Sequence, residues 1–301
     1  MTTAARNLAR FALVILGALG SVILTASPAN ACTLLYADGG GLTPCGATAA
    51  ALGLAALGTG AGVALVASAA VSLARAANME MAADNPRILT QAVAQLLSEL
   101  DAQALAGAQR QLQATAAGMG LPVTAFAPGP LAEVPFTPTT GSLVAAMRAV
   151  EGIGADYVRQ LSLAQVSTTY QTAAQLGQNL AVPQTRGSGT QIFRSDTRTE
   201  LEDTLTAGYM REGAPYAQAQ ARAASEAKAV MSQFAALHLP DLVAGGFDTA
   251  TTLGLRSVNS SIGSQLRPDR LGAQLRAYVD SIPPQLRPTT LVNLIFRLHL
   301  P

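Results

Sequence analysis

The segment DNPRILTQAVAQLLSEL, residues 84–100, decides the fold class of this chain. It opens with a capping residue, Asp84, and places Pro86 in the first turn, where a helix tolerates a missing N–H. Apolar side chains then recur every three or four positions, at Ile88, Leu89, Ala92, Val93, Leu96, Leu97 and Leu100. This spacing predicts a strong amphipathic helix that fades near Gly118 and Gly120.

The segments that follow alternate between helical composition and runs of Pro and Gly. Residues 121–141 are rich in proline, which predicts a loop or linker. Residues 142–180 predict further helix, with a weak point at Gly152 and Gly154, and residues 181–190 form a second linker and a candidate domain boundary. Strand-like alternation is scarce, so the predicted fold is mainly α, with N-terminal apolar helices, a helical middle region and an all-α C-terminal domain.

The overall composition is unusual for a soluble protein. The 301 residues are 50% apolar but only 12% charged, whereas roughly 25% of residues are charged in ordinary soluble domains. Between Arg10 and Arg75 the only charged residue is Asp38. This excludes one uniformly soluble globule and indicates membrane or secretion sequence. The net charge of +1 means that no global positive field attracts nucleic acid.

The N-terminal 31 residues have the pattern of a secretory signal peptide. Arg6 and Arg10 precede an uncharged stretch, residues 11–27, and an Ala-Asn-Ala site ends at Ala31. A basic region, an apolar region and small residues at the cleavage site predict cleavage after Ala31. The alternative is an uncleaved first membrane helix.

A second apolar run occupies residues 47–74 of the Gly- and Ala-rich segment 32–78. It exceeds the about 20 residues that span a bilayer, which predicts a candidate membrane helix, and a buried soluble helix hairpin is the alternative. Cys32 and Cys45 are the only cysteines. Export would allow them to form a disulfide, and otherwise they are two idle thiols.

The C-terminal third contains the residues with the clearest chemical potential. Two helices are expected, over residues 196–206 and 215–237, and Pro240 ends the second one near His238. Asp241 then lies in the first turn of a new helix. A histidine can take a proton from water near neutral pH, and a nearby carboxylate can orient it or bind a divalent metal. By spacing alone, a surface histidine beside a capping aspartate explains the pattern as well.

A second polar string, LRSVNSSIGSQLR at residues 255–267, lies downstream of ALHLPDLVAGG. Together the two strings resemble the polymorphic toxin type 15 family, a mainly helical nuclease domain with an HxxD motif. The family occurs in bacterial antagonism toxins, including DNase effectors of type VI secretion. The resemblance covers roughly residues 190–280 and is strongest over 235–267. It departs from the family at Leu266, where an aromatic residue, usually Trp, is expected.

The resemblance implies a metal-dependent nuclease that cleaves phosphodiester bonds, in DNA more readily than in RNA. His238 would be the general base, and Asp241 would bind a divalent metal, Mg²⁺, or orient His238. Five further residues are candidates for contacting the phosphate or fixing the motif loop: Arg256, Asn259, Ser260, Gln265 and Arg267. The alternative for the three uncharged residues is that they stabilise turns. The alternative for the two arginines, above all for Arg267, is a solvated position on the surface.

Other reaction classes lack their sequence motifs. The chain has no G-x-S-x-G nucleophile elbow, no Walker A sequence and no G-x-G-x-x-G between a strand and a helix. His299, the second histidine, lies in an apolar terminal stretch and is interpreted as a packing or surface residue.

The sequence therefore predicts an antibacterial toxin that is secreted or membrane-associated and acts in the cytoplasm of a target cell. Its expected parts are residues 1–31, 32–78, 79–190 and a nuclease domain at 191–301. Expected partners are DNA or RNA, a cognate immunity protein, secretion-apparatus or adaptor proteins, and the target membrane. The alternatives are an RNase toxin, or a membrane-anchored helical interaction protein with an inactive C-terminal domain.

Overall fold

The computed structural model describes residues 36–37, 41–42, 86–138, 141–149, 151–182, 188–239, 242, 250–267 and 269–299. The predicted signal peptide, the candidate membrane helix at 47–74, and both cysteines lie outside these residues. Among the helices within them, none combines the length and apolarity needed to cross a bilayer.

The first long helix, α4 (Pro86–Gly118), confirms the prediction made from residues 84–100. All seven apolar positions that define its spacing are buried. Just beyond the helix, Gly120 adopts a φ of 66°, a left-handed conformation that favours glycine, so the chain turns where the periodicity fades.

The expected helical region after residue 141 is also confirmed. It consists of α5 (Gly141–Ala149), α6 (Glu151–Thr169) and α7 (Ala173–Ala181). The chain leaves α5 and enters α6 next to the weak point predicted at Gly152. The helix α7 begins with a capping box, in which the Thr172 side chain accepts from the backbone N–H of Gln175 and the Gln175 side chain accepts in return.

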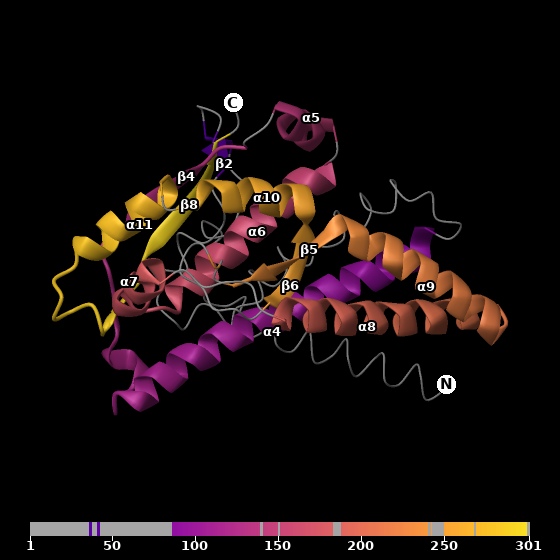
Figure 1. Cartoon of the computed structure of the whole chain (residues 1–301), viewed down its shortest axis with the longest axis horizontal. Helices are drawn as coiled ribbons and strands as arrows, with labels where there is room; N and C mark the ends of the chain where they lie inside the picture. The colour runs from indigo at the N-terminus through magenta and orange to yellow at the C-terminus, as the bar shows by residue number, and fades with distance from the viewer. Residues whose placement is uncertain are drawn as a thin grey trace, which may run out of the picture.

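Two antiparallel helices follow, α8 (Gly189–Arg211) and α9 (Tyr216–Gln233). They lie side by side at one end of the molecule (Figure 1), joined by a turn in which Gly213 has a φ of 94°. The charged helix expected at 196–206 is the middle of α8.

The proline-rich segment 121–141 is not simply a linker, contrary to the prediction. It contains the short η3 (Val123–Ala125) and β3 (Ala127–Pro128), and then β4 (Ala132–Phe136), which pairs in parallel with β8 (Leu294–His299). Pro135 is tolerated because β4 is the edge strand of a sheet with the order β1 (Tyr36–Ala37), β2 (Gly41–Leu42), β8 and β4.

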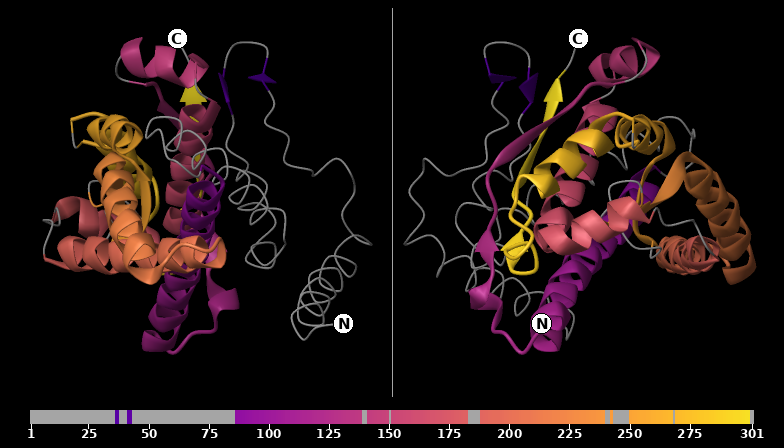
Figure 2. Two further views of the ribbon diagram at one scale, coloured as in Figure 1. Left: turned by 90° about the vertical axis from the view of Figure 1, so that its right-hand side faces the viewer. Right: turned by 60° about the vertical axis from the view of Figure 1, so that its left-hand side comes forward.

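The other sheet pairings are short. On the far side of β8 lie β1 (Tyr36–Ala37) and β2 (Gly41–Leu42), and β3 pairs with β7 (Thr290–Leu291). Figure 2 shows β8 running beside β4, and α6 packs against β8.

The C-terminal part is not all-α, which corrects the predicted fold class there. The helix expected to reach residue 237 ends at Gln233, and the chain continues as β5 (Phe234–His238). This strand forms an antiparallel hairpin with β6 (Ala250–Leu255) and is followed by α10 (Arg256–Gln265) and α11 (Leu271–Asp280). Since β5 is mostly buried, its apolar run lacks the alternation that distinguishes a strand from a helix end.

One hydrophobic core extends from Ile88 in α4 to Leu298 in β8 and includes side chains from α6, α8, α9, α10 and α11. It therefore crosses the boundary predicted between residues 190 and 191. Leu266, which stands where the family has an aromatic residue, is fully buried in this core. The departure is thus a change in core packing.

Candidate active site

His238 is the last residue of β5 and is only 5% exposed. Its Nε2 atom lies 3.3 Å from Oγ1 of Thr190, in the first turn of α8. The strand pairing is irregular between Leu237 and His238, so that His238 pairs with Ala250. Such irregularities redirect a side chain out of the regular alternation of a strand and are common beside active sites.

Asp241, the other half of the HxxD motif, lies outside the described residues, as do its neighbours Pro240 and Val243. Its roles as a metal ligand or as the group that orients His238 stay predictions. Within the described part of the chain, no cluster of three or more His, Cys, Asp or Glu side chains could hold a metal ion.

The helix α8 holds β5 at both ends. Thr190 contacts His238 at the end of the strand, and Arg194, one turn further along α8, reaches its beginning. Arg194 donates from Nη1 to the carbonyl oxygen of Phe234 and from Nη2 to that of Met231, both at 2.6 Å. Burial, together with the positive charge of Arg256, lowers the pKa of Arg194. The helix α8 thus contacts β5 through Thr190 at His238 and through Arg194 at Phe234.

Sequence reasoning missed both α8 residues. Thr190 falls in the segment predicted as a linker, and Arg194 has no motif around it. Their contacts join residues 48 and 40 positions apart in the chain, and no local pattern indicates such a pairing.

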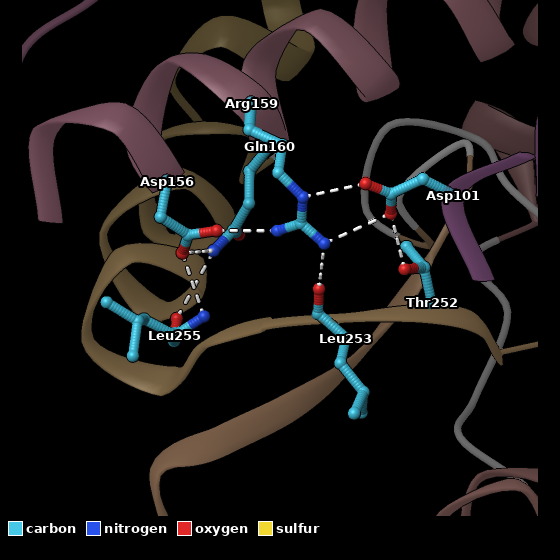
Figure 3. Close-up of polar contacts among 7 residues, drawn as sticks. All are labelled: Asp101, Asp156, Arg159, Gln160, Thr252, Leu253 and Leu255. Carbon is cyan, nitrogen blue, oxygen red and sulfur yellow. Dashed lines mark hydrogen bonds and ion pairs between the residues drawn. The ribbon is translucent and has the colours of Figure 1, made fainter. Parts of the chain in front are cut away.

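The opposite edge of the hairpin is held by a fully buried ionic network, shown in Figure 3. Arg159 of α6 donates from Nε to Asp101 Oδ2 at 2.7 Å and from Nη1 to Asp156 Oδ1 at 2.6 Å. Its Nη2 donates to Asp101 Oδ1 at 3.0 Å and to the carbonyl oxygen of Leu253 at 2.6 Å. One guanidinium therefore joins α4, α6 and β6.

This network takes the place of a third strand beside β6 (Figure 3). In an antiparallel pair, alternate residues direct their backbone groups away from the partner strand. In β6 these are Leu253, whose carbonyl accepts from Arg159, and Leu255, whose N–H donates to Asp156 Oδ2 at 2.8 Å. Gln160 completes the edge by donating to the Leu255 carbonyl at 3.4 Å. Because buried backbone groups require partners, these side chains fix the position of the hairpin.

Gly254 allows α6 and the hairpin to approach this closely. A Cβ atom at this position would lie 2.6 Å from Cδ of Gln160 and 2.9 Å from Cδ1 of Leu237. Both distances are shorter than a van der Waals contact, so a larger residue would force the side chains of Gln160 and Leu237 to shift.

The buried network has two carboxylates for one guanidinium. Burial raises the pKa of Asp156 above its usual value, because it outweighs the attraction of Arg159 and the hydrogen bonds from Leu255 and Gln160. Burial alone would lower the pKa of Arg159, but the negative charges of Asp101 and Asp156 raise it above the usual value for arginine. Arg159 therefore stays charged, and Asp156 binds a proton more readily than an exposed aspartate.

The remaining predicted residues lie in or after a helix, where a motif loop was expected. Arg256 is the first residue of α10 and is exposed, Asn259 is half-buried and Ser260 is exposed. Leu255 pairs with Phe234 and Ala250 with His238, so Arg256 and His238 are at opposite ends of the hairpin. At about 3.3 Å per residue, four strand residues separate them by roughly 13 Å.

Gln265 and Arg267, at the C-terminal end of α10 and just beyond it, both interact with other side chains or backbone groups. Gln265 is buried, accepts from the backbone N–H of Thr137 at 2.7 Å and donates to Tyr157 Oη at 3.1 Å. It therefore fixes the end of α10 against β4 and α6. Arg267 is exposed and forms a 3.7 Å ion pair with Asp269.

The comparison with known families matches residues 156–294 to the family described as Novel toxin 15, Ntox15. No curated protein matches the chain. The matched region begins in α6 at Asp156, ends in β8 at Leu294, and includes His238. It confirms the resemblance predicted from the two sequence strings and extends it to the α6 residues that hold the hairpin.

Proposed function

We propose that this chain, a polymorphic toxin with a Novel toxin 15 domain at residues 156–294, is a metal-dependent nuclease that cleaves DNA. One observation carries the proposal. His238 lies inside the toxin domain, nearly buried at an irregular strand end, with Nε2 held beside Thr190. A histidine with a fixed ring is suited to act as a general base.

In the proposed reaction, His238 takes the proton of a water molecule that attacks a phosphodiester. Histidine is a common general base in proteins, because its neutral imidazole nitrogen can accept a proton from water. The contact between Nε2 and Thr190 Oγ1 restrains the ring whichever of the two atoms is the donor. Rigid placement contributes to the rate because the water and the base need no further ordering in the transition state.

The described residues do not by themselves fit a metal site built from protein ligands alone. Mg²⁺, however, is commonly held by one or two carboxylates together with waters and substrate phosphates. We therefore assign Asp241 as its protein ligand, or alternatively as the group that orients His238. When bound, the metal would neutralise negative charge on the phosphate.

The toxin domain indicates a secreted effector that acts on target cells. Action in the target cytoplasm, export through a secretion apparatus or adaptor proteins, and contact of the N-terminal region with the target membrane are part of the proposal. A producing cell would also require a cognate immunity protein to protect its own DNA.

The testing experiment incubates the purified full chain with supercoiled plasmid and, separately, with a structured RNA. Each reaction contains either Mg²⁺ or a chelator. We expect the plasmid to be nicked with Mg²⁺ and to survive with chelator. His238→Ala should abolish cleavage, whereas His299→Ala, at the exposed second histidine, should preserve it. Cleavage of RNA alone would indicate an RNase toxin, and cleavage of neither substrate would contradict the proposal.

A further inference from the structure

Among the described residues, Arg194 and Arg256 are a pair of neighbouring cations without an acidic partner. Arg194 donates to the carbonyl oxygen of Phe234, which pairs with Leu255, the residue before Arg256, so the two arginines are neighbours in the fold. The charge of Arg256 also contributes, after burial, to lowering the pKa of Arg194. Within the described residues, neither takes part in an ion pair. Six of the other described arginines each pair with a carboxylate, so ion pairing is common but not general among them: Arg159, Arg198, Arg222, Arg267, Arg287 and Arg297.

Arg194 is held in place but is not saturated. Its two 2.6 Å hydrogen bonds, to the carbonyls of Met231 and Phe234, use one N–H from each terminal nitrogen. A guanidinium has five N–H donors, so three stay available for a ligand. The side chain is half-buried, which fixes its direction while leaving part of it accessible.

Arg256 is exposed at the first position of α10. A cation at the positive N-terminal end of a helix destabilises the fold, and so does a cation beside a second cation. The stability of the fold therefore does not explain why an arginine occupies position 256. The position at the helix end and the closeness of the two cations both become favourable when an anion with several acceptor oxygens lies between the two arginines. Phosphate has this geometry, and arginine binds it through paired N–H groups.

The arginine pair and His238 lie at opposite ends of β5. Arg194 contacts the residue that pairs with Leu255, immediately before Arg256, and His238 lies about 13 Å away along β5. Thr190 and Arg194 are one turn apart on α8 and contact opposite ends of β5. Phosphates follow one another at about 3.4 Å of helix axis per strand. A phosphate at the arginine pair is therefore a few nucleotides from one at His238.

We propose that Arg194 and Arg256 together hold one backbone phosphate of the nucleic acid, a few nucleotides from the bond that His238 attacks. The part of this inference that places the cleaved bond at His238 rests on the proposed nuclease function. The arginine pair itself requires only that the chain binds a polyanionic strand.

The test measures DNA binding without cleavage. A fluorescently labelled duplex is titrated with the full chain carrying His238→Ala, in chelator, over a series of salt concentrations. Adding Arg256→Gln should weaken binding on the order of tenfold at low salt, as expected for one charged hydrogen-bonded contact. It should also reduce the slope of log K against log salt by about 0.9, the value for one phosphate contact. Arg256→Lys should retain most of the slope.

Arg198→Gln is the matched control, because Arg198 is an exposed arginine one turn further along α8 that pairs with Glu202 at 2.6 Å. It should leave affinity and slope unchanged. Inorganic phosphate at millimolar concentration tests whether the pair prefers a free anion, and weak competition is expected. Arg194→Gln would also remove the hydrogen bonds to the carbonyl oxygens of Met231 and Phe234, so Arg256→Gln is the cleaner test.

An unchanged slope in Arg256→Gln would overturn the inference, and so would a duplex that the parent chain does not bind. This experiment distinguishes failure of the proposed phosphate contact from failure of the proposed nuclease function. A chain that cleaves DNA but is insensitive to Arg256→Gln refutes the phosphate contact alone. A chain that binds DNA through Arg256 but cleaves no substrate retains the contact and refutes the nuclease.

Discussion

Replacing Arg159 with methionine should strongly destabilise the fold. The substitution keeps most of the apolar stem but removes the group that neutralises Asp101 and Asp156, both fully buried. Breaking a buried ion pair by removing one partner costs about 3–5 kcal/mol, because a charge is left buried without compensation. The carbonyl of Leu253 also loses its donor, which costs about 1–3 kcal/mol. Since the two costs overlap, we expect a loss of about 4 kcal/mol.

Urea unfolding of the full chain at neutral pH, followed by circular dichroism, measures this loss. A domain is commonly stable by about 5–15 kcal/mol, so a loss of about 4 kcal/mol is a large fraction of the total and should lower the urea midpoint markedly. Arg198→Met, which breaks an exposed ion pair, should change stability by less than about 1 kcal/mol.

A neutral triple variant tests the electrostatic reasoning itself. Combining Arg159→Met with Asp101→Asn and Asp156→Asn removes all three charges from the network. It should be more stable than Arg159→Met alone, because no carboxylate is left uncompensated. If Arg159→Met costs less than about 1 kcal/mol, or if the triple variant is less stable than the single one, the network does not act as described.

Three further predictions follow from the hairpin and its surroundings. The pKa of Asp156 is raised in the folded chain. The stability that Asp156 contributes is therefore fully present below the pKa of this residue in the unfolded chain, and it is lost as pH rises through the pKa in the folded chain. Urea unfolding should therefore show that, between pH 3.5 and 7, the unfolding free energy of Asp156→Asn falls less with rising pH than that of the wild type. Equal pH dependence in the two proteins would contradict the raised pKa. Gly254→Ala should lower the unfolding free energy by about 1–3 kcal/mol through overpacking against Gln160, measured in the same assay, and a neutral effect would show that α6 yields easily. Thr190→Val, which keeps the shape of the side chain but loses the contact with His238, should lower kcat more than it raises KM and leave thermal unfolding nearly unchanged; a change confined to KM would place Thr190 in substrate binding instead.

The helical parts of the fold were predictable because their information is local. In α4 the apolar spacing and the capping residues occur within a few turns, and every predicted core position is buried. The strands were missed for the same reason. The pairing of β4 with β8 joins residues about 160 positions apart, such as Val134 and Phe296, and β5 is too short and too buried to show alternation.

The candidate site was only partly predictable. His238 was found through resemblance to a family, and its burial and contact with Thr190 emerged only from the structure. The ionic network had no signal in the sequence, because Asp101 and Arg159 are 58 residues apart and each resembles an ordinary charged residue of a helix. Gln265 was predicted to contact phosphate or to fix the motif loop. In the structure its polar atoms contact Thr137 and Tyr157 at the end of α10, and its role in the reaction stays a prediction.

The most direct test of the central claim is cleavage of supercoiled plasmid by the full chain with Mg²⁺, compared among the wild type, His238→Ala, Asp241→Asn and His299→Ala. The account predicts nicking by the wild type and by His299→Ala, and loss of nicking in the other two variants while their thermal unfolding stays close to that of the wild type. Nicking by a folded His238→Ala at the wild-type rate would contradict it.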